Sequence, residues 1–196
     1  MRVLVACEFS GTVRDAFTRA GHYAVSADPL PSETFGPHFQ GDVRDILHRG
    51  WDLLVAHPPC TYLANSGVRW LREREGRWQD MEAACAFFCD LLNAPIPYRC
   101  IENPVPHRYA RALIGSYTQT VQPWQFGHGE VKRTCFWLRN LPPLVPTNVV
   151  AGREARVHKM PPGPDRWKER SRFYRGIADA MASQWGAYVE QQRRAA

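Results

Sequence analysis

The segment His57-Pro58-Pro59-Cys60 places a nucleophilic side chain in a stiff loop. Each proline fixes its own φ at about −65° and restricts the residue before it. A cysteine thiolate is the most nucleophilic of the common side chains near neutral pH, and a rigid loop would hold it at a fixed attack distance. Cys60 is therefore a candidate nucleophile, although a lone Pro-Pro-Cys more often only ends a strand. We interpret His57 as a strand-end residue that forms hydrogen bonds.

A carboxylate follows the next long apolar segment, in Ile101-Glu102-Asn103-Pro104. Because the carboxyl ends of neighbouring parallel strands meet at one edge of a sheet, we expect Glu102 beside Cys60. A carboxyl group there can protonate or hydrogen-bond a ring nitrogen while a thiolate attacks the same ring. The alternative is that Glu102 only accepts hydrogen bonds from loop amides.

Strands that alternate with helices would position these side chains. Apolar strand segments are predicted at 2–6, 23–27, 51–56, 99–102, 117–122 and 133–138, and helices at 11–20, 43–47, 77–93, 108–114 and 177–191. This alternation predicts an α/β fold with a mostly parallel sheet that helices cover on both faces. Ligands of such sheets bind beyond the carboxyl ends of the strands, where Phe9-Ser10-Gly11, Asp28, Cys60 and Glu102 all fall.

The bulk composition is that of a soluble globular protein. The 196 residues are 44% hydrophobic and 22% charged, and we expect one domain over 1–196. No apolar run approaches the ~20 residues that span a bilayer, and the start lacks a signal peptide, so we expect a cytoplasmic protein. The six cysteines include no CxxC pair, and we interpret them as free thiols that bind no metal.

Positive charge is concentrated in an irregular, Pro- and Gly-rich segment over 142–175. From Arg153 to Arg175 there are eight Lys/Arg against three Asp/Glu, and the net charge of the chain is +6. Aromatic residues lie among these charges, which suits a polyanion with stackable bases such as DNA. A solvated basic surface is the alternative. The candidate phosphate contacts are Arg153, Arg156, Arg166, Lys168, Arg170 and Arg172.

The order of short motifs resembles that of DNA cytosine-5 methyltransferases, most of all the short methyltransferase-like proteins of bacteriophages and prophages. The matching motifs, in chain order, are Phe9-Ser10-Gly11, Asp28, Gly41-Asp42, Pro58-Pro59-Cys60, Glu102-Asn103 and Lys132-Arg133. They cover residues 1–140, and the pair of Pro-Pro-Cys with Glu-Asn is the specific part. The resemblance implies a Rossmann-like class I fold with a mostly parallel seven-stranded sheet and S-adenosyl-L-methionine as cofactor.

The resemblance also implies the cofactor contacts. Phe9-Ser10-Gly11 would form the loop under the methionine part of S-adenosylmethionine. Asp28 would bind the ribose hydroxyls, and Asp42 would accept a hydrogen bond from the adenine amino group. Pro58 would help to close the cofactor pocket.

For catalysis, the resemblance implies that Cys60 adds to C6 of cytosine so that C5 becomes the methyl acceptor. Glu102 would interact at N3 and the exocyclic amine, and Arg133 would support the base or its O2. In a bacterial host cytoplasm the partner would be DNA, either duplex or single-stranded. In a duplex the target base must first rotate out of the stack.

Two departures leave alternatives open. Thr12-Val13-Arg14 stands where the family has further glycines, and the chain has no room for a large target-recognition domain. Weak sequence preference, a single-stranded substrate or a free nucleotide are therefore all compatible with the sequence. A non-catalytic nucleic-acid-binding protein on a methyltransferase scaffold is a second class. An amino-group methyltransferase is a third, but Cys60 then stands where its aromatic residue should stack and Glu102 has no use.

Overall fold

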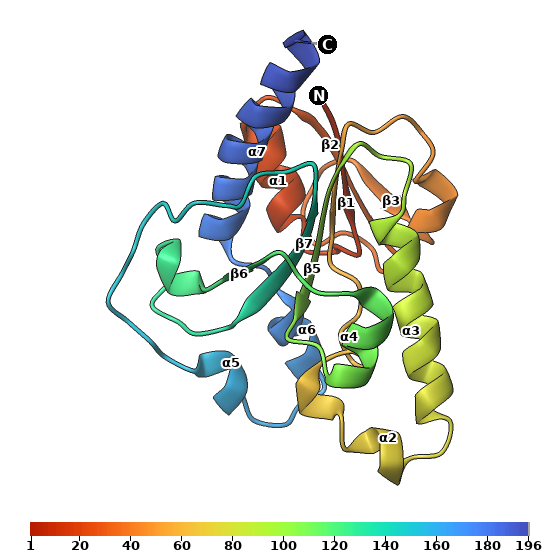
Figure 1. The fold of residues 1–196 in the computed structure, drawn as a ribbon. Coiled ribbons are helices and arrows are strands. Elements are labelled where there is room, and N and C mark those ends of the chain that lie inside the picture. The colour runs from red at the N-terminus through yellow and green to blue at the C-terminus, as the bar shows by residue number, and fades with distance from the viewer. Residues whose placement is uncertain (196) are drawn as a thin grey trace.

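A seven-stranded sheet forms the centre of the molecule in the computed structural model, which describes residues 1–195 (Figure 1). The strands lie in the order β3-β2-β1-β4-β5-β7-β6. Their bounds are β1 Arg2–Ala6, β2 Tyr23–Asp28, β3 His38–Gln40, β4 Leu53–Ala56, β5 Tyr98–Pro104, β6 Gln119–Val121 and β7 Thr134–Arg139.

The first five strands run parallel, whereas β7 is antiparallel to both β5 and β6. The expected Rossmann-like class I fold, mostly parallel with seven strands, is confirmed. The order of the strands reverses at β1, and ligands of open α/β sheets bind beside such a switch point. The short edge strand β3 was not predicted from the sequence, because Phe39 is its only apolar residue.

Helices cover both faces of the sheet. They are α1 Thr12–Arg19, α2 Trp70–Glu73, α3 Arg77–Leu92, α4 Arg108–Ile114, α5 Arg156–Lys159, α6 Arg166–Ser171 and α7 Arg175–Ala195, with 3-10 turns at Val43–Ile46, Asn65–Gly67 and Pro123–Gln125. One core lies between the sheet, α1 and α7, and includes Val3 and Val5. The other lies on the α3 and α4 side and includes Leu4 and Ala6, so successive β1 residues point to opposite cores.

Burial on both faces explains the continuous apolar runs. Val3 to Ala6 and Leu53 to Ala56 have no exposed surface. Strands of parallel sheets covered by helices show this pattern. On α3 the buried stripe contains Met81, Cys85 and Phe88. Trp78, on the same helix, lies outside this stripe and is 39% exposed.

The carboxyl ends of β1 and β4 lie at the edge of the sheet away from the two chain termini (Figure 1). Segment 142–175 crosses towards that edge and is irregular except for α5 and α6, two short helices that its prolines and glycines concealed. No helix among residues 1–195 is both long and apolar enough to span a membrane.

Candidate active site

Cys60 and Glu102 follow neighbouring strands at the same sheet edge. The register of β4 and β5 pairs Ala56 with Ile101, so Glu102 lies opposite His57, three residues before the cysteine. Cys60 is an exposed residue, whereas the side chain of Glu102 is largely buried. The structure thus brings the candidate nucleophile and the candidate acid to one edge.

Hydrogen bonds fix the loop that carries Cys60. The buried Asn103 side chain donates from Nδ2 to the carbonyl of Pro58 over 2.8 Å. The amides of Leu63 and Ala64 donate to the Cys60 carbonyl over 3.1 and 2.9 Å. Asn103 of β5 therefore fixes the loop at Pro58, and the position of the Cys60 thiol depends on both β4 and β5.

The thiol of Cys60 lies between charges of opposite sign. Desolvation by its surroundings raises the pKa of the thiol, and the negative charge of Glu102 raises it further. The cations of Lys132 and Arg170 lower the pKa. Desolvation and the charge of Glu102 thus oppose ionisation of the thiol, whereas the two nearby cations favour it.

His57 contacts the candidate acid directly. Its Nδ1 lies 3.0 Å from Oε2 of Glu102, and both side chains are largely buried. The ring of Phe173 packs against the imidazole, with 4.7 Å between the ring centroids. His57 is a strand-end residue that forms a hydrogen bond, as interpreted from the sequence. Its partner could not be identified from the sequence alone.

Lys132 reaches the site, whereas Arg133 is exposed just before β7. Lys132 Nζ donates to the carbonyl of Arg170 over 2.9 Å and lies 5.7 Å from the centre of the Tyr174 ring. The resemblance implies a role for the second residue of this basic pair, and a dipeptide alone does not indicate which of its side chains turns inward.

A pocket of about 540 Å³ opens beside the carboxyl ends of β2 and β3. Asp28 and Asp42 line it together with Cys7, Ala27, Pro29, Gln40, Gly41, Val43, Arg44 and Phe87. We call it the β2–β3 pocket. Burial raises the pKa of Asp28, which accepts a 2.9 Å hydrogen bond from the amide of Leu30. Hydrogen bonds from Arg44 lower the pKa of Asp42.

The hydrogen-bond acceptors of this pocket fit the nucleoside half of S-adenosylmethionine. Two carboxylates can accept hydrogen bonds from ribose hydroxyls and from an amino group, and the volume lies in the range of small-ligand sites. Pro58 is not among the lining residues. It is buried, and its carbonyl accepts from Asn103.

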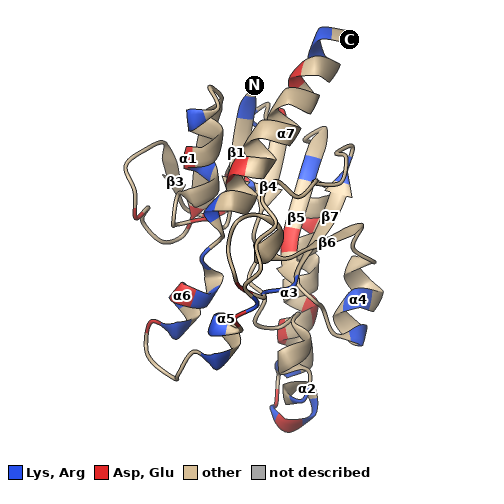
Figure 2. Cartoon of the chain, turned by 90° about the vertical axis from the view of Figure 1, so that its left-hand side faces the viewer, with Lys and Arg blue, Asp and Glu red and all other residues tan. Residues whose placement is uncertain are grey.

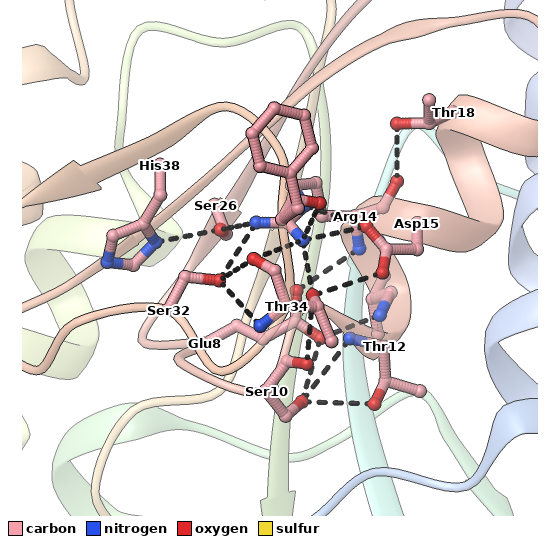
Figure 3. A network of polar contacts seen from close by, with 12 residues as sticks. Glu8, Ser10, Thr12, Arg14, Asp15, Thr18, Ser26, Ser32, Thr34 and His38 are labelled. Atoms are coloured by element: carbon pink, nitrogen blue, oxygen red, sulfur yellow. Dashed lines mark hydrogen bonds and ion pairs between the residues drawn. The ribbon is translucent and has the colours of Figure 1, made fainter.

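The Phe9-Ser10-Gly11 turn begins α1 and is tightly packed. Gly11 has φ +72°, and a Cβ at this position would lie 2.1 Å from Thr34 Oγ1 and 2.5 Å from Arg14 Nη2. The fully buried Arg14 donates to the hydroxyls of Ser26 and Ser32 over 3.2 and 3.0 Å (Figure 3). Arg14 therefore locks the loop after β2 onto the turn.

Glu8 satisfies the first amides of α1. Its buried carboxylate accepts from the amides of Val13 and Arg14 over 2.6 and 3.1 Å, and burial raises its pKa (Figure 3). These two amides are therefore not free for an acidic group of a ligand. The ring of Phe9 faces Trp167 of α6, with 6.2 Å between the centroids.

Much of the predicted basic segment is paired within the chain. Lys168 Nζ lies 2.7 Å and Arg172 Nη1 2.5 Å from the carboxylate of Glu33, and Arg156 Nε lies 3.0 Å from Glu130. These contacts fold α6 back over the loop after β2. Ion pairs with Glu33 and Glu130 therefore attach this segment to the rest of the domain at this sheet edge.

The other basic residues of this segment have different environments. Arg153 stacks on Trp124, with 3.9 Å from the guanidinium carbon to the ring centroid. Arg166 Nε donates to the carbonyl of Met160 over 2.9 Å. The charge of Arg170 acts on the Cys60 thiol. Among residues 1–195, no group of three or more His, Cys, Asp or Glu is arranged to hold a metal ion.

Comparison with known proteins gives remote structural likeness only. No protein-family profile and no curated protein match the sequence. A candidate DNA modification methyltransferase encoded within an E. coli prophage is similar at a TM-score of 0.49 and 15% identity, over 76% of this chain and 52% of that one. The Entamoeba histolytica methyltransferase EhMeth is similar at 0.48 and 13%, over 79% and 57%. S. pombe Dnmt2 methyltransferase is similar at 0.45 and 15%, over 80% and 53%.

The chain spans about half the length of these proteins, and all three TM-scores are below 0.5. The likeness therefore carries no argument about activity. The fold rests on the order and direction of the strands, and the chemistry rests on the residues at their ends.

Proposed function

We propose that this protein methylates carbon 5 of cytosine in DNA, with S-adenosylmethionine as methyl donor. The observation that carries the proposal is the placement of an exposed cysteine residue and a largely buried carboxylate after neighbouring parallel strands. The pairing of Ala56 with Ile101 sets Glu102 beside the start of the loop that carries Cys60, so one pyrimidine ring bound at this edge would meet both groups. The motif order of the sequence points to the same chemistry.

In the proposed reaction the Cys60 thiolate forms a bond to C6 of the cytosine ring, which makes C5 electron-rich. Glu102 hydrogen-bonds or protonates N3 and so stabilises the adduct. When bound, S-adenosylmethionine would supply the electrophilic methyl group that C5 accepts, with S-adenosylhomocysteine as the leaving group. The C5 proton then leaves to a base, the sulfur–C6 bond breaks, and the thiolate of Cys60 is restored.

Three further residues would support these steps. His57 would hold the Glu102 carboxylate through the 3.0 Å contact at Nδ1. Lys132 would favour ionisation of the thiol. Arg133 would contact the base from its exposed position before β7, as the resemblance implies.

The β2–β3 pocket would bind the nucleoside half of the cofactor. Asp28 would accept hydrogen bonds from the ribose, and Asp42 from the adenine amino group. The Phe9-Ser10-Gly11 turn would lie under the methionine part. Pro58 would shape the wall between this turn and the catalytic loop.

A second candidate function follows from the packing of that turn. Glu8 already uses the Val13 and Arg14 amides, and Arg14 and Thr34 fill the space beside Gly11. These contacts favour a protein that binds nucleic acid on this scaffold without catalysis. Calorimetry with S-adenosylmethionine separates the two functions, because only the methyltransferase requires the cofactor.

The test is mass spectrometry of nucleosides after incubation with S-adenosylmethionine and DNA, RNA or free cytidine nucleotides. We expect 5-methylcytosine from DNA with the wild-type protein. Cys60→Ser should give none but should still bind the cofactor, because the thiol acts in chemistry and lies outside the pocket lining. N4-methylcytosine or N6-methyladenine as the product would overturn the proposal, and a methylated free nucleotide would replace its substrate.

A further inference from the structure

A second pocket, of about 480 Å³, lies between α2 and α4. Three arginines line it, and only one acidic side chain does so. The lining residues are Asn65, Val68, Arg69, Leu71, Arg72, Glu73, Arg108 and Tyr109. We call it the α2–α4 pocket. Its charge was not singled out in the sequence, because Glu73 and Glu75 alternate with Arg72 and Arg74, and Arg108 is remote in the chain.

The arginines of this pocket have no carboxylate partner. Among residues 1–195, neither Arg69, Arg72 nor Arg108 forms an ion pair, and Arg72 and Arg108 are exposed. The basic residues around α6 differ, since Lys168 and Arg172 share Glu33. Charge that is unpaired in the protein is available to an external anion.

Aromatic rings hold the guanidinium groups in place. Arg69 lies 4.2 Å from the centroid of Trp70, and Arg108 lies 4.6 Å from that of Tyr109. Stacking on a ring leaves the in-plane N–H groups of a guanidinium free to donate. Arg108 Nη2 also donates to the hydroxyl of Tyr109, and hydrogen bonds from Arg108 and Arg72 hold the pKa of this phenol below its ordinary value.

The pocket is joined to the loop of the candidate nucleophile. Asn65, one of its lining residues, donates its amide to the carbonyl of Val105 over 2.9 Å. Arg77 Nη2 donates to the carbonyl of Thr61 over 2.7 Å, and His107 Nε2 lies 3.0 Å from that of Tyr62. The loop that follows Cys60 therefore runs directly into the pocket wall through fixed contacts.

Figures 1 and 2 show that α2 and α4 lie at the same end of the molecule as α5 and α6, but to one side of them. In Figure 2, basic positions mark both groups of helices. A nucleic-acid strand bound along this end would meet α2 and α4 next to the loop that carries Cys60.

We infer that the α2–α4 pocket binds backbone phosphates of the nucleic-acid substrate, with Arg72 and Arg108 as the main contacts. Guanidinium groups bind phosphate oxygens in a bidentate manner, and several of them in one pocket suit a phosphodiester chain. The inference rests on the proposed function for the identity of the polymer. It predicts that affinity for the strand comes largely from this pocket and less from the paired residues around α6.

The test compares Arg72→Gln/Arg108→Gln with Arg139→Gln/Arg194→Gln. Arg139 is paired in register with Arg99 at the start of β5, on the opposite edge of the sheet, and Arg194 is near the end of α7; both are exposed. The two variants lose the same formal charge. Binding of a cytosine-containing DNA oligonucleotide, in the form that the wild type binds more tightly, is measured by fluorescence anisotropy over a salt series.

We expect the pocket variant to bind at least about tenfold more weakly at low salt, with a salt dependence reduced by about two phosphate contacts. The control variant should differ little from the wild type. Equal losses in both variants, or no loss in either, would overturn the inference. So would a wild type that binds free deoxycytidine monophosphate at these arginines but binds no oligonucleotide.

Calorimetry with S-adenosylmethionine and methylation assays on the same variants separate this inference from the proposed function. If the product is 5-methylcytosine, the pocket variant should show a raised KM for DNA with kcat nearly unchanged. DNA binding that depends on these arginines, without any methylation, would support phosphate binding by the pocket and overturn the proposed function. Methylation with an unaltered KM in the pocket variant would support the proposed function and overturn phosphate binding by the pocket.

Discussion

The Nδ1 atom of His57 lies 3.0 Å from Oε2 of Glu102, across the ends of two neighbouring strands. The ring of Phe173 packs on the imidazole and limits its rotation. The carboxylate that would act at N3 of a pyrimidine is therefore oriented by a histidine next to the nucleophile loop. With Nδ1 protonated, His57 donates to Oε2 of Glu102, and the carboxylate keeps further acceptor sites for a substrate.

His57→Phe should lower kcat by about tenfold, the effect of losing one hydrogen bond to a charged group. The phenyl ring keeps the packing against Phe173 but has no donor. His57→Asn, which places an amide nitrogen near the position of Nδ1, should recover part of the rate. Both variants should bind the cofactor as the wild type does. We would measure kcat against pH for all three proteins.

If the contact is only structural, His57→Phe will change the melting temperature but not kcat or its pH profile. A similar rate for the phenylalanine and asparagine variants would also contradict a positioning role.

The pKa of the Cys60 thiol should move in opposite directions in two variants. The charge of Glu102 disfavours the thiolate, so Glu102→Gln should lower the thiol pKa and speed alkylation by iodoacetamide near neutral pH. Lys132 favours the thiolate, so Lys132→Gln should raise the pKa and slow alkylation. Alkylation at residue 60 is followed by peptide mass spectrometry across pH.

Glu102→Gln should also lose methyl transfer by about 100-fold or more, although its thiol is more reactive. A more reactive thiol together with lost turnover would show that Glu102 acts on the cytosine ring and does not activate Cys60. Retained turnover in this variant would remove Glu102 from catalysis.

Asp28→Asn should weaken binding of S-adenosylmethionine by about tenfold or more, because a charged acceptor of the pocket is lost. Burial raises the pKa of Asp28, so wild-type affinity should fall as the pH drops through this raised pKa, at a higher pH than an ordinary aspartate would give. The variant should lack this pH dependence. Asp80→Asn, at an exposed carboxylate of α3 outside the pocket, is the control. Equal affinities of both variants in calorimetry would place the cofactor elsewhere.

Gly11→Ala should destabilise the protein more than Gly50→Ala does. Both glycines have φ +72°, so both substitutions impose similar backbone strain, of about 1 kcal/mol or more. A Cβ at Gly50 meets nothing within 4 Å, whereas one at Gly11 meets Thr34 and Arg14. Thermal or urea unfolding would measure the difference. Equal losses would mean that the turn is not packed against these side chains.

The sequence was sufficient for the fold and for the ends of the central strands. Buried parallel strands are almost entirely apolar, β4 throughout and β1 after Arg2, so their carboxyl ends and the polar residues that follow them are visible in the sequence. The edge strand β3 is short and polar, and its place depends on pairing with β2. Such an element cannot be identified from its own residues.

Long-range charge pairing was the part that the sequence could not supply. The sequence makes Lys168 and Arg172 candidate phosphate contacts, and the fold pairs both of them with Glu33, far away in the chain. Likewise, the role of Arg14 depends on Ser26 and Ser32, which only the fold brings near. Local patterns give the sign of a charge but not its partner.

The covalent bond between Cys60 and C6 of cytosine is tested by trapping with DNA that contains 5-fluorocytosine, in the presence of S-adenosylmethionine. Fluorine at C5 cannot leave as a proton does, so the bond between Cys60 and C6 should persist. We predict a denaturation-resistant protein–DNA complex with the wild type, with the link mapped to residue 60, and none with Cys60→Ser. A wild-type protein that forms 5-methylcytosine in normal DNA but no covalent complex with the fluorinated DNA would contradict the central claim.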